Sequence, residues 1–345
     1  MLKKGVKALF KFRFVLDKFQ KSDARGPTIT PNVRAKWLTK LCPPDLQIAF
    51  APNSGEIPMY DSNKIKLVSK EETGWWNHYF LIRNMLANNK IGWSYGPNID
   101  EKISVNPKVP LVCNSVYQKN LILKAWSKHQ ADLIHIIPNI IDREVFYPEQ
   151  RSQKITVGWI GYDVDYKRVK GAEVIPYLAR KFPEIQFEMV HAIKPRYMNE
   201  WLPKKLPNLK IYYEVPHNKM AGIIRKWHVL VSGSKTETGG THIKEAMACG
   251  VPVIASSFGA MPEIASSQIL LKDLQTKLLP GNRNARYWTT ESLEKYASAL
   301  TSVLGSPSRQ KMLAAAAIEE SKKSDPHIIS KKWFNFIYMC RDLSK

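Results

Sequence analysis

The chain has 345 residues, 44% of them hydrophobic, and a formal net charge of +22. The length exceeds one typical core and predicts two domains, and the apolar content is that of a globular protein. No apolar run reaches the roughly 18 residues that a membrane-spanning helix requires, which argues against a helical membrane protein.

The first part of the chain is strongly basic. Residues 1–40 contain eleven lysines and arginines and two acidic residues, whereas residues 41–150 contain eleven of each. Residues 10–14 alternate between aromatic and basic side chains, which predicts a strand. Residues 2–9 have the lysine and apolar spacing of an amphipathic helix on an anionic membrane. The helix can end at about residue 9 and the strand can follow it. The alternative to membrane contact is a basic surface that faces solvent.

The rest of the first half alternates between expected helices and strands, which is typical of layered α/β proteins. We expect helices at 32–41, 78–88 and 117–128, and strands at 46–51, 109–114 and 133–137. Loop residues dominate 52–75, with one strand expected at 65–68. A polar linker at 150–153 predicts a domain boundary near residue 150.

The second half continues the alternation. We expect strands at 155–160, 185–190, 209–213, 229–231 and 251–255, and helices at 172–181, 219–226, 243–249 and 328–343. The last helix is amphipathic. This pattern predicts a second α/β layer after the linker.

The most informative pattern precedes and includes the expected helix at the centre of the second half. Glu237 and Glu245 flank Gly239 and Gly240, and Gly250 predicts a left-handed end to the helix. Two glycines let the backbone approach a ligand closely, and the free N–H groups of the helix start then point at an anion. Because both carboxylates can reach hydroxyl groups beside that anion, the pattern predicts a sugar-nucleotide site. Surface glutamates on an ordinary strand–helix–strand unit are the alternative.

This order of residues resembles the donor site of retaining glycosyltransferases of family 4, also called group 1. The two glutamates are followed by Ala-Met-Ala-Cys-Gly-Val-Pro-Val-Ile-Ala at 246–255 and Gly-x-x-Pro-Glu at 259–263. Residues 138–148 resemble the hinge with which these enzymes leave their first domain. The resemblance implies an α/β fold of GT-B type, in which two Rossmann-like domains face a central cleft.

The resemblance also implies that the chain is divided into two domains and a C-terminal helix. We expect an N-terminal Rossmann-like domain at 1–150, which is trimmed because only about forty-five residues precede its strand at 46–51. A nucleotide-sugar-binding domain is expected at 151–325. A C-terminal helix at 326–345 would pack back on the first domain.

The resemblance implies a retaining transfer in which Glu237 and Lys170 are catalytic. Glu245 would hold the ribose hydroxyls, and the diphosphate would lie on the amides before and at the helix start. The expected donor-binding residues are Gly161, Lys167, Arg168, Gly239, Gly240, Thr241, His242, Glu245, Gly259 and Glu263.

The chain departs from the family pattern after the strand at 155–160. The family places Gly-Arg there and then Lys-Gly, but here a tyrosine follows Gly161. Lys170 matches the Lys-Gly element, and Lys167 and Arg168 can replace the missing arginine. Lysine reaches phosphate as a point charge, whereas plain surface charges are the alternative for each residue alone.

Four residues of the first domain are expected on the acceptor side. Gly26 would lie in the remnant of the family's glycine-rich loop. Trp75 and Trp76 offer flat faces for a sugar, or they fill the core. His78 would lie near the donor sugar, with a packed histidine as the alternative.

We expect no cofactor and no required metal. The nearest acidic pair, Asp163 and Asp165, lies in a basic loop. The expected partners are a nucleotide sugar, a saccharide or lipid-linked acceptor of polysaccharide or lipopolysaccharide biosynthesis, and an anionic membrane surface that binds residues 1–40. The four scattered cysteines support neither a zinc site nor a disulfide framework. They favour a cytoplasmic protein, with peripheral attachment to the inner face of a membrane.

Three alternatives remain open on the sequence. The acceptor can be modified DNA, which the net charge of +22 would attract. A nucleotide-sugar epimerase has the same two-domain fold. A non-catalytic polyanion-binding protein would also use the basic surface.

Overall fold

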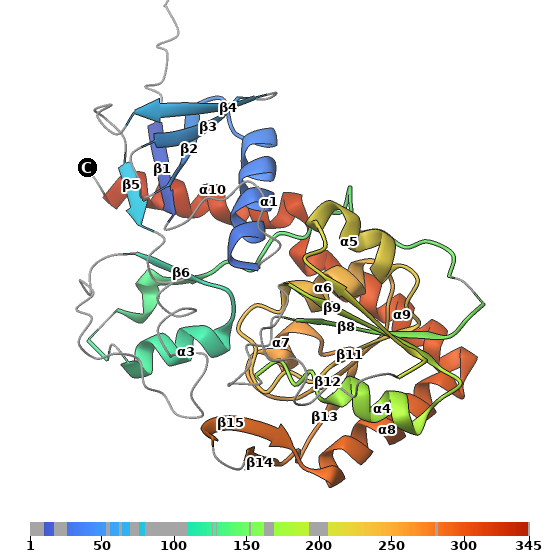
Figure 1. The fold of residues 1–345 in the computed structure, drawn as a ribbon. Coiled ribbons are helices and arrows are strands. Elements are labelled where there is room, and N and C mark those ends of the chain that lie inside the picture. Colours follow the sequence, from blue (N-terminus) through green and yellow to red (C-terminus); the bar gives the residue numbers. More distant parts are fainter. Residues whose placement is uncertain are drawn as a thin grey trace, which may run out of the picture.

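The computed structural model describes residues 10–16, 26–52, 56–61, 64–69, 76–79, 110–125, 127–128, 130–151, 153–161, 169–192, 206–279 and 282–343. These residues form two groups of strands and helices, which Figure 1 shows at its upper left and lower right. Each group contains a sheet with parallel strands.

The first sheet is built from the start of the chain. β1 (Phe10–Leu16) lies between β2 (Leu46–Pro52) and β5 (Trp76–Tyr79) and is parallel to both. β3 (Glu56–Asp61) and β4 (Lys64–Ser69) extend the sheet in antiparallel fashion, in the order β4-β3-β2-β1-β5. β1 confirms the strand expected at this position.

The first helix differs from the expectation. α1 (Gly26–Lys40) begins six residues earlier than the helix expected at 32–41. Gly26 is the first residue of α1, so its placement in the remnant of a glycine-rich loop is wrong. Pro27 follows it, and proline is favoured in the first turn of a helix because the N–H that it lacks has no partner there. The amphipathic helix expected at 2–9 lies outside the described residues.

Strands also replace an expected loop and the start of an expected helix. The loop at 52–75 contains two strands, β3 and β4, rather than one. His78 lies in β5, so a helix that begins at this residue is wrong, and residues 80–88 lie outside the described part. Pairing with β1 decides the backbone conformation here, because strand formation depends on neighbours more than on local preference.

A small strand–helix–strand unit follows. β6 (Leu111–Cys113) pairs in parallel with β7 (Ile134–Ile136), and α3 (Val116–Ala125) and the short η1 (Ala131–Leu133) connect them. These elements confirm the strand, helix and strand expected in this stretch.

The second sheet has six parallel strands in the order β10-β9-β8-β11-β12-β13. They are β8 (Thr156–Gly161), β9 (Gln186–His191), β10 (Leu209–Tyr213), β11 (Val229–Ser232), β12 (Val253–Ser256) and β13 (Ile269–Leu271). The strand order reverses between β8 and β11, as in Rossmann folds, and ligands bind beyond the carboxyl ends of the strands at such a point.

Helices cover both faces of this sheet (Figure 1). One face carries α4 (Val174–Lys181) and α8 (Thr290–Leu304), and the other carries α5 (His217–Ile224), α6 (Thr241–Ala248), α7 (Met261–Ile264) and α9 (Pro307–Ser321). Because both faces are covered, β11 is a continuous apolar run in which Val229, Leu230 and Val231 are fully buried. A hairpin of β14 (Thr276–Leu279) and β15 (Asn282–Trp288) lies next to this layer.

The last helix returns to the first sheet. α10 (Pro326–Leu343) follows the short η3 (Lys322–Ser324), and Figure 1 shows it in red behind the blue strands. Trp333 and Ile337 of α10 share a buried cluster with Phe12 of β1 and Trp37 and Leu38 of α1. The expected helix that packs back on the first domain is confirmed. None of the helices in the described ranges has both the length and the apolar character needed to cross a bilayer.

The buried indole of Trp333 should carry much of the attachment of α10. The Trp333→Ala variant removes a side chain that is 1% exposed, and the guanidinium of Arg34 lies 4.6 Å from its ring. We expect the free energy of unfolding to fall by about 3–5 kcal/mol in urea titrations. Asn335→Ala, at an exposed position of the same helix, is the control and should change it by less than about 0.5 kcal/mol. Equal stability of the two variants would contradict this packing.

Candidate active site

The loops after β8 and β11 contact one another at the point where the strand order reverses. A Cβ atom on Gly171 would lie 1.9 Å from the carbonyl oxygen of Gly233, and φ of Gly171 is +59°. The N–H of Lys235 also donates to the carbonyl oxygen of Val169 at 2.8 Å. Only glycines allow so close an approach, and it brings the end of the first loop next to the second.

Lys170 and Glu237 form an ion pair between these loops. The Nζ atom of Lys170 lies 2.5 Å from Oε1 of Glu237, and the hydroxyl of Ser234 donates to the same oxygen at 2.8 Å. Their side chains are 17% and 7% exposed. Burial alone would raise the pKa of Glu237, but Lys170 and His242 lower it overall, so the carboxylate is ionised at neutral pH. The structure thus brings together the two residues predicted to be catalytic.

Gly161 supports the position of Lys170. A Cβ atom on Gly161 would lie 2.5 Å from the indole of Trp159 and 3.1 Å from Cβ of Lys170. The indole N–H of Trp159 donates to the carbonyl oxygen of Lys170 at 3.2 Å. Lys167 and Arg168 lie outside the described residues, so their contact with phosphate stays a prediction.

The start of α6 faces the same place. Gly240, with φ of +49°, precedes the first helical residue, Thr241. The N–H groups of Thr241 and His242 have no carbonyl partner within the helix, and the positive end of the helix dipole lies here. Nε2 of His242 lies 3.9 Å from Oε1 of Glu237, and burial lowers the pKa of His242 despite that carboxylate. A neutral histidine and free amides next to an ammonium form a site suited to an anion.

The first domain contributes two amide side chains that were not among the expected site residues. Nδ2 of Asn139 donates to the hydroxyl of Thr241 at 2.6 Å. A Cβ atom on Gly239 would lie 3.1 Å from Nδ2 of Asn114 and 3.3 Å from Nδ2 of Asn139. Asn139 belongs to the hinge motif at 138–148, which was a signal for its position. The site therefore includes residues from the loop after β6 and from the hinge as well as from the second sheet.

Glu245 lies in α6 and is bound to a histidine that the sequence pattern did not reveal. Nε2 of His217 lies 2.7 Å from Oε1 of Glu245, and the two side chains are 20% and 8% exposed. His217 precedes Glu245 by 28 residues and begins α5. No spacing in the sequence connects the two residues.

Gly259 and Glu263 also lie at this edge of the sheet. A Cβ atom on Gly259 would lie 2.6 Å from the carbonyl oxygen of Glu237, so the glycine lets two loops contact one another. The carboxylate of Glu263 accepts the backbone N–H groups of Val116 and Tyr117 at 2.7 and 2.8 Å. Glu263 therefore caps the start of α3 from the second domain. Its contact with the base of a donor stays a prediction.

The residues expected on the acceptor side lie in different elements or outside the described structure. Trp76 and His78 are residues of β5, Gly26 begins α1, and Trp75 lies outside the described residues. The acceptor site stays a prediction. Its one changed part is Gly26, which begins a helix instead of lying in a loop.

No metal site is seen within the described ranges. These residues contain no group of three His, Cys, Asp or Glu side chains that could hold an ion. Asp163 and Asp165 lie in the range 162–168, which is not described. Transfer without a metal therefore stays a prediction.

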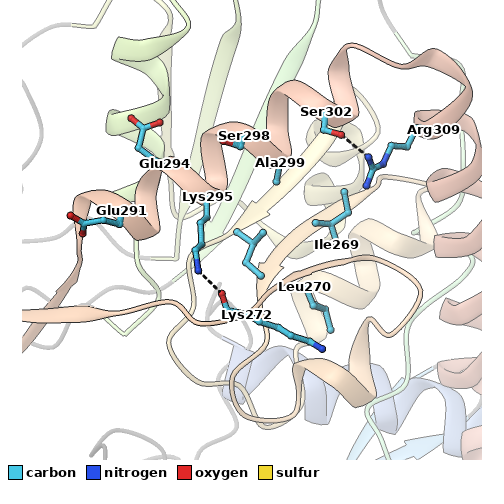
Figure 2. A pocket seen from close by; sticks show the side chains of 11 residues that line it. Ile269, Leu270, Lys272, Glu291, Glu294, Lys295, Ser298, Ala299, Ser302 and Arg309 are labelled. Atoms are coloured by element: carbon cyan, nitrogen blue, oxygen red, sulfur yellow. Dashed lines mark hydrogen bonds between the residues drawn. The ribbon is translucent and has the colours of Figure 1, made fainter.

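A cavity of about 630 Å³ lies elsewhere, between the edge strand β13 and α8 (Figure 2). Ile269 and Leu271 line it from the strand, and Glu291 and Lys295 line it from the helix. Lys295 points across it and donates to the carbonyl oxygen of Lys272 at 3.2 Å. None of the residues expected to bind the donor lines this cavity.

Comparisons with known proteins agree with the geometry. Residues 172–319 match the family described as glycosyl transferases group 1. This part of the chain is therefore similar to group 1 glycosyltransferase domains. The chain is also 23% identical over 168 residues to a human (Homo sapiens) component of phosphatidylinositol N-acetylglucosaminyltransferase, and the match covers 47% of this chain and 34% of that protein. It thus spans about a third of the length of that curated relative.

Two solved structures share the fold. Sucrose-phosphate synthase from Thermosynechococcus elongatus matches with a TM-score of 0.66 and 15% identity, over 97% of this chain and 100% of that one. WaaG, a glycosyltransferase involved in lipopolysaccharide biosynthesis, matches with a TM-score of 0.61 and 12% identity, over 94% and 99%. The fold is therefore GT-B with two Rossmann-like domains, and the domain match and fold together support a glycosyltransferase enzyme.

The buried ion pair should be sensitive to loss of its cation. In Lys170→Met, the buried carboxylate of Glu237 loses its paired cation, and we expect the free energy of unfolding to fall by about 3–5 kcal/mol at neutral pH. Because the folded protein lowers the pKa of Glu237, the contribution of the pair is present at neutral pH and is lost as the pH falls through that lowered pKa.

The measurement is urea unfolding of wild type and variant from neutral to acidic pH. Lys181→Met is the matched control, because Lys181 and Glu294 form an ion pair with side chains 41% and 45% exposed. Such a pair contributes less than about 1 kcal/mol. Similar losses in the two lysine variants would show that the Lys170 pair has no special role in stability.

Proposed function

We propose that the protein is a retaining family 4 glycosyltransferase that moves a sugar from a nucleotide sugar to a saccharide or lipid-linked acceptor. The observation that carries the proposal is the Lys170–Glu237 pair, which lies next to the start of α6 where the strand order of the second sheet reverses. A cation, a carboxylate and free helix amides at one place suit a ligand with both phosphate and hydroxyl groups.

In this proposal the diphosphate of the donor lies on the amides at Gly240, Thr241 and His242 and near Lys170. The bond between the anomeric carbon and the diphosphate oxygen breaks, and the diphosphate leaves with the bonding electrons. The acceptor hydroxyl oxygen bonds to the same face of that carbon, and its proton passes to the departing diphosphate oxygen. Preorganised amides and an ammonium stabilise the charge that develops on the leaving group.

The two glutamates have different tasks in this proposal. Glu237 faces the donor sugar, where its carboxylate orients the sugar hydroxyls and the Lys170 ammonium. Glu245 binds the ribose hydroxyls through the oxygen that His217 does not occupy. No metal takes part in the proposed reaction.

The acceptor class follows from charge and from the relatives. The net charge of +22 favours an anionic acceptor or membrane surface. The name of the human relative includes phosphatidylinositol, and WaaG is involved in lipopolysaccharide biosynthesis. We therefore propose a phosphorylated or membrane-held glycan as the acceptor, with the enzyme attached peripherally to an anionic membrane.

A ligand panel tests the donor site. A ligand that binds only the folded protein adds about 2.7 kcal/mol of stability at a hundredfold excess over its Kd, so the melting temperature should rise. We expect this rise for one nucleotide series among UDP, GDP, ADP and their sugars. The rise should be lost in Glu245→Ala and kept in Glu319→Gln, whose side chain is 73% exposed. Absence of a shift for every nucleotide at millimolar concentration would rule out the proposed donor site.

The remaining alternatives are separated by product analysis with the nucleotide sugar that binds. Transfer requires an acceptor and releases a nucleoside diphosphate in equal amount. An epimerase would change the nucleotide sugar without an acceptor, and transfer to DNA would require modified DNA in the assay. A protein that binds polyanions without catalysis would give no product under any of these conditions.

A further inference from the structure

His217 lies between the second carboxylate of the site and the segment that joins the two domains. Its Nε2 atom is 2.7 Å from Oε1 of Glu245. Its ring also contacts Phe146, with 5.1 Å between the ring centroids, and Phe146 is fully buried. Because both contacts hold it, the imidazole has little freedom to move away from Glu245.

We propose that His217 is a positioning residue for the donor, which holds the Glu245 carboxylate toward the ribose hydroxyls. This inference rests on the proposed function, because it requires that Glu245 binds ribose. His217 occupies Oε1, and within the described residues Oε2 of Glu245 has no hydrogen-bond partner. A donor on one carboxylate oxygen fixes the plane of the group and leaves the other oxygen for two neighbouring hydroxyls.

The helix that carries His217 is attached to the interdomain segment at both ends. At the carboxyl end of α5, Nη2 of Arg225 donates to the carbonyl oxygen of Val145 at 2.5 Å, and Nη1 lies 2.7 Å from Oε1 of Glu149. The guanidinium also lies 3.8 Å from the ring centroid of Tyr147. The position of His217 therefore depends on residues 142–149, which connect the two domains.

Charges around the imidazole favour its protonated form. Burial lowers the pKa of His217, but Glu245 and Asp142 raise it overall. Asp142 is itself paired with Lys36 at 2.7 Å, and Glu245 also acts on the neighbouring His242. The imidazolium binds Glu245 most strongly below the raised pKa, and this contribution is lost as the pH rises through it.

The test compares each nucleoside diphosphate with its 2′,3′-dideoxy analogue. Isothermal titration of UDP, GDP and ADP pairs gives a ratio of affinities that reports the ribose hydroxyls alone. We expect wild type to prefer the ribose form, and His217→Phe to reduce that preference about tenfold, because a hydrogen bond to a charged group is lost. Binding of the dideoxy form should change little, whereas a general loss of structure would weaken both forms.

Two further variants separate positioning from folding. In Glu245→Ala the preference should disappear, and adding His217→Phe should have no further effect on the ratio. His217→Gln keeps a neutral donor near Oε1, so it should retain part of the preference and lose its dependence on pH between neutral and alkaline conditions. If His217→Phe does not fold, the affinity ratio and its pH dependence are measured with His217→Gln instead.

The outcomes distinguish the two proposals. Wild type that binds no nucleoside diphosphate overturns the proposed function and this inference together. Wild type that prefers the ribose form, with an unchanged ratio in His217→Phe or an unchanged pH dependence in His217→Gln, overturns the role of His217 alone.

Discussion

The buried ion pair between Lys170 and Glu237 is the interaction on which the arrangement of the site depends. Two charges taken out of water lose hydration, and the pair persists only where its geometry and further hydrogen bonds offset that loss. Here the hydroxyl of Ser234 supplies a hydrogen bond, and the close contact of Gly171 with Gly233 sets the distance between the loops. The reversal of strand order between β8 and β11 places both loops at one edge of the sheet. Fold topology and local electrostatics therefore meet at one pair of side chains.

The second domain does not complete the site by itself. Asn139 of the hinge satisfies the hydroxyl of the first residue of α6, and Glu263 of the second domain satisfies the first amides of α3 in the first. The Glu263 contact supplies partners to backbone N–H groups that have none within their own helix, whereas the Asn139 contact binds a side-chain hydroxyl. The helix α10 adds an apolar contact between the same two domains. Polar contacts at two helix starts and the packing of α10 therefore join the two domains.

The sequence predicted the second sheet well because its strands are buried on both faces. Continuous apolar runs such as the one at 229–231 allow few other interpretations. The candidate donor residues could be predicted from the sequence because glycines and glutamates occur at fixed spacing within one loop and helix. His217 was missed because 28 residues separate it from Glu245, and only the packing of α5 on α6 brings them together. The same holds for Glu263 and Val116, which are 147 residues apart.

The errors in the first domain have a different origin. Loop residues between 52 and 75 were assigned by composition, but two strands form there because β2 offers an edge for pairing. Gly26 and Pro27 are common in loops, yet a proline also fits the first turn of a helix. In both cases the local sequence permitted two structures, and tertiary contacts selected one of them.

In this strongly basic chain, the buried acidic groups of the site each have a basic partner. Glu237 pairs with Lys170, Glu245 with His217, and Glu173 with Lys235, whose side chain is only 1% exposed. An incoming diphosphate therefore meets no unbalanced negative charge from these three carboxylates. Lys170 is more exposed than Glu237, so its ammonium can contact the ligand while it keeps the carboxylate in place. Lys235 is much more deeply buried; its ammonium pairs with Glu173 and lies 5.0 Å from the centroid of the Trp288 ring. Of these two neighbouring lysines, Lys170 has the exposure that the proposed ligand contact requires.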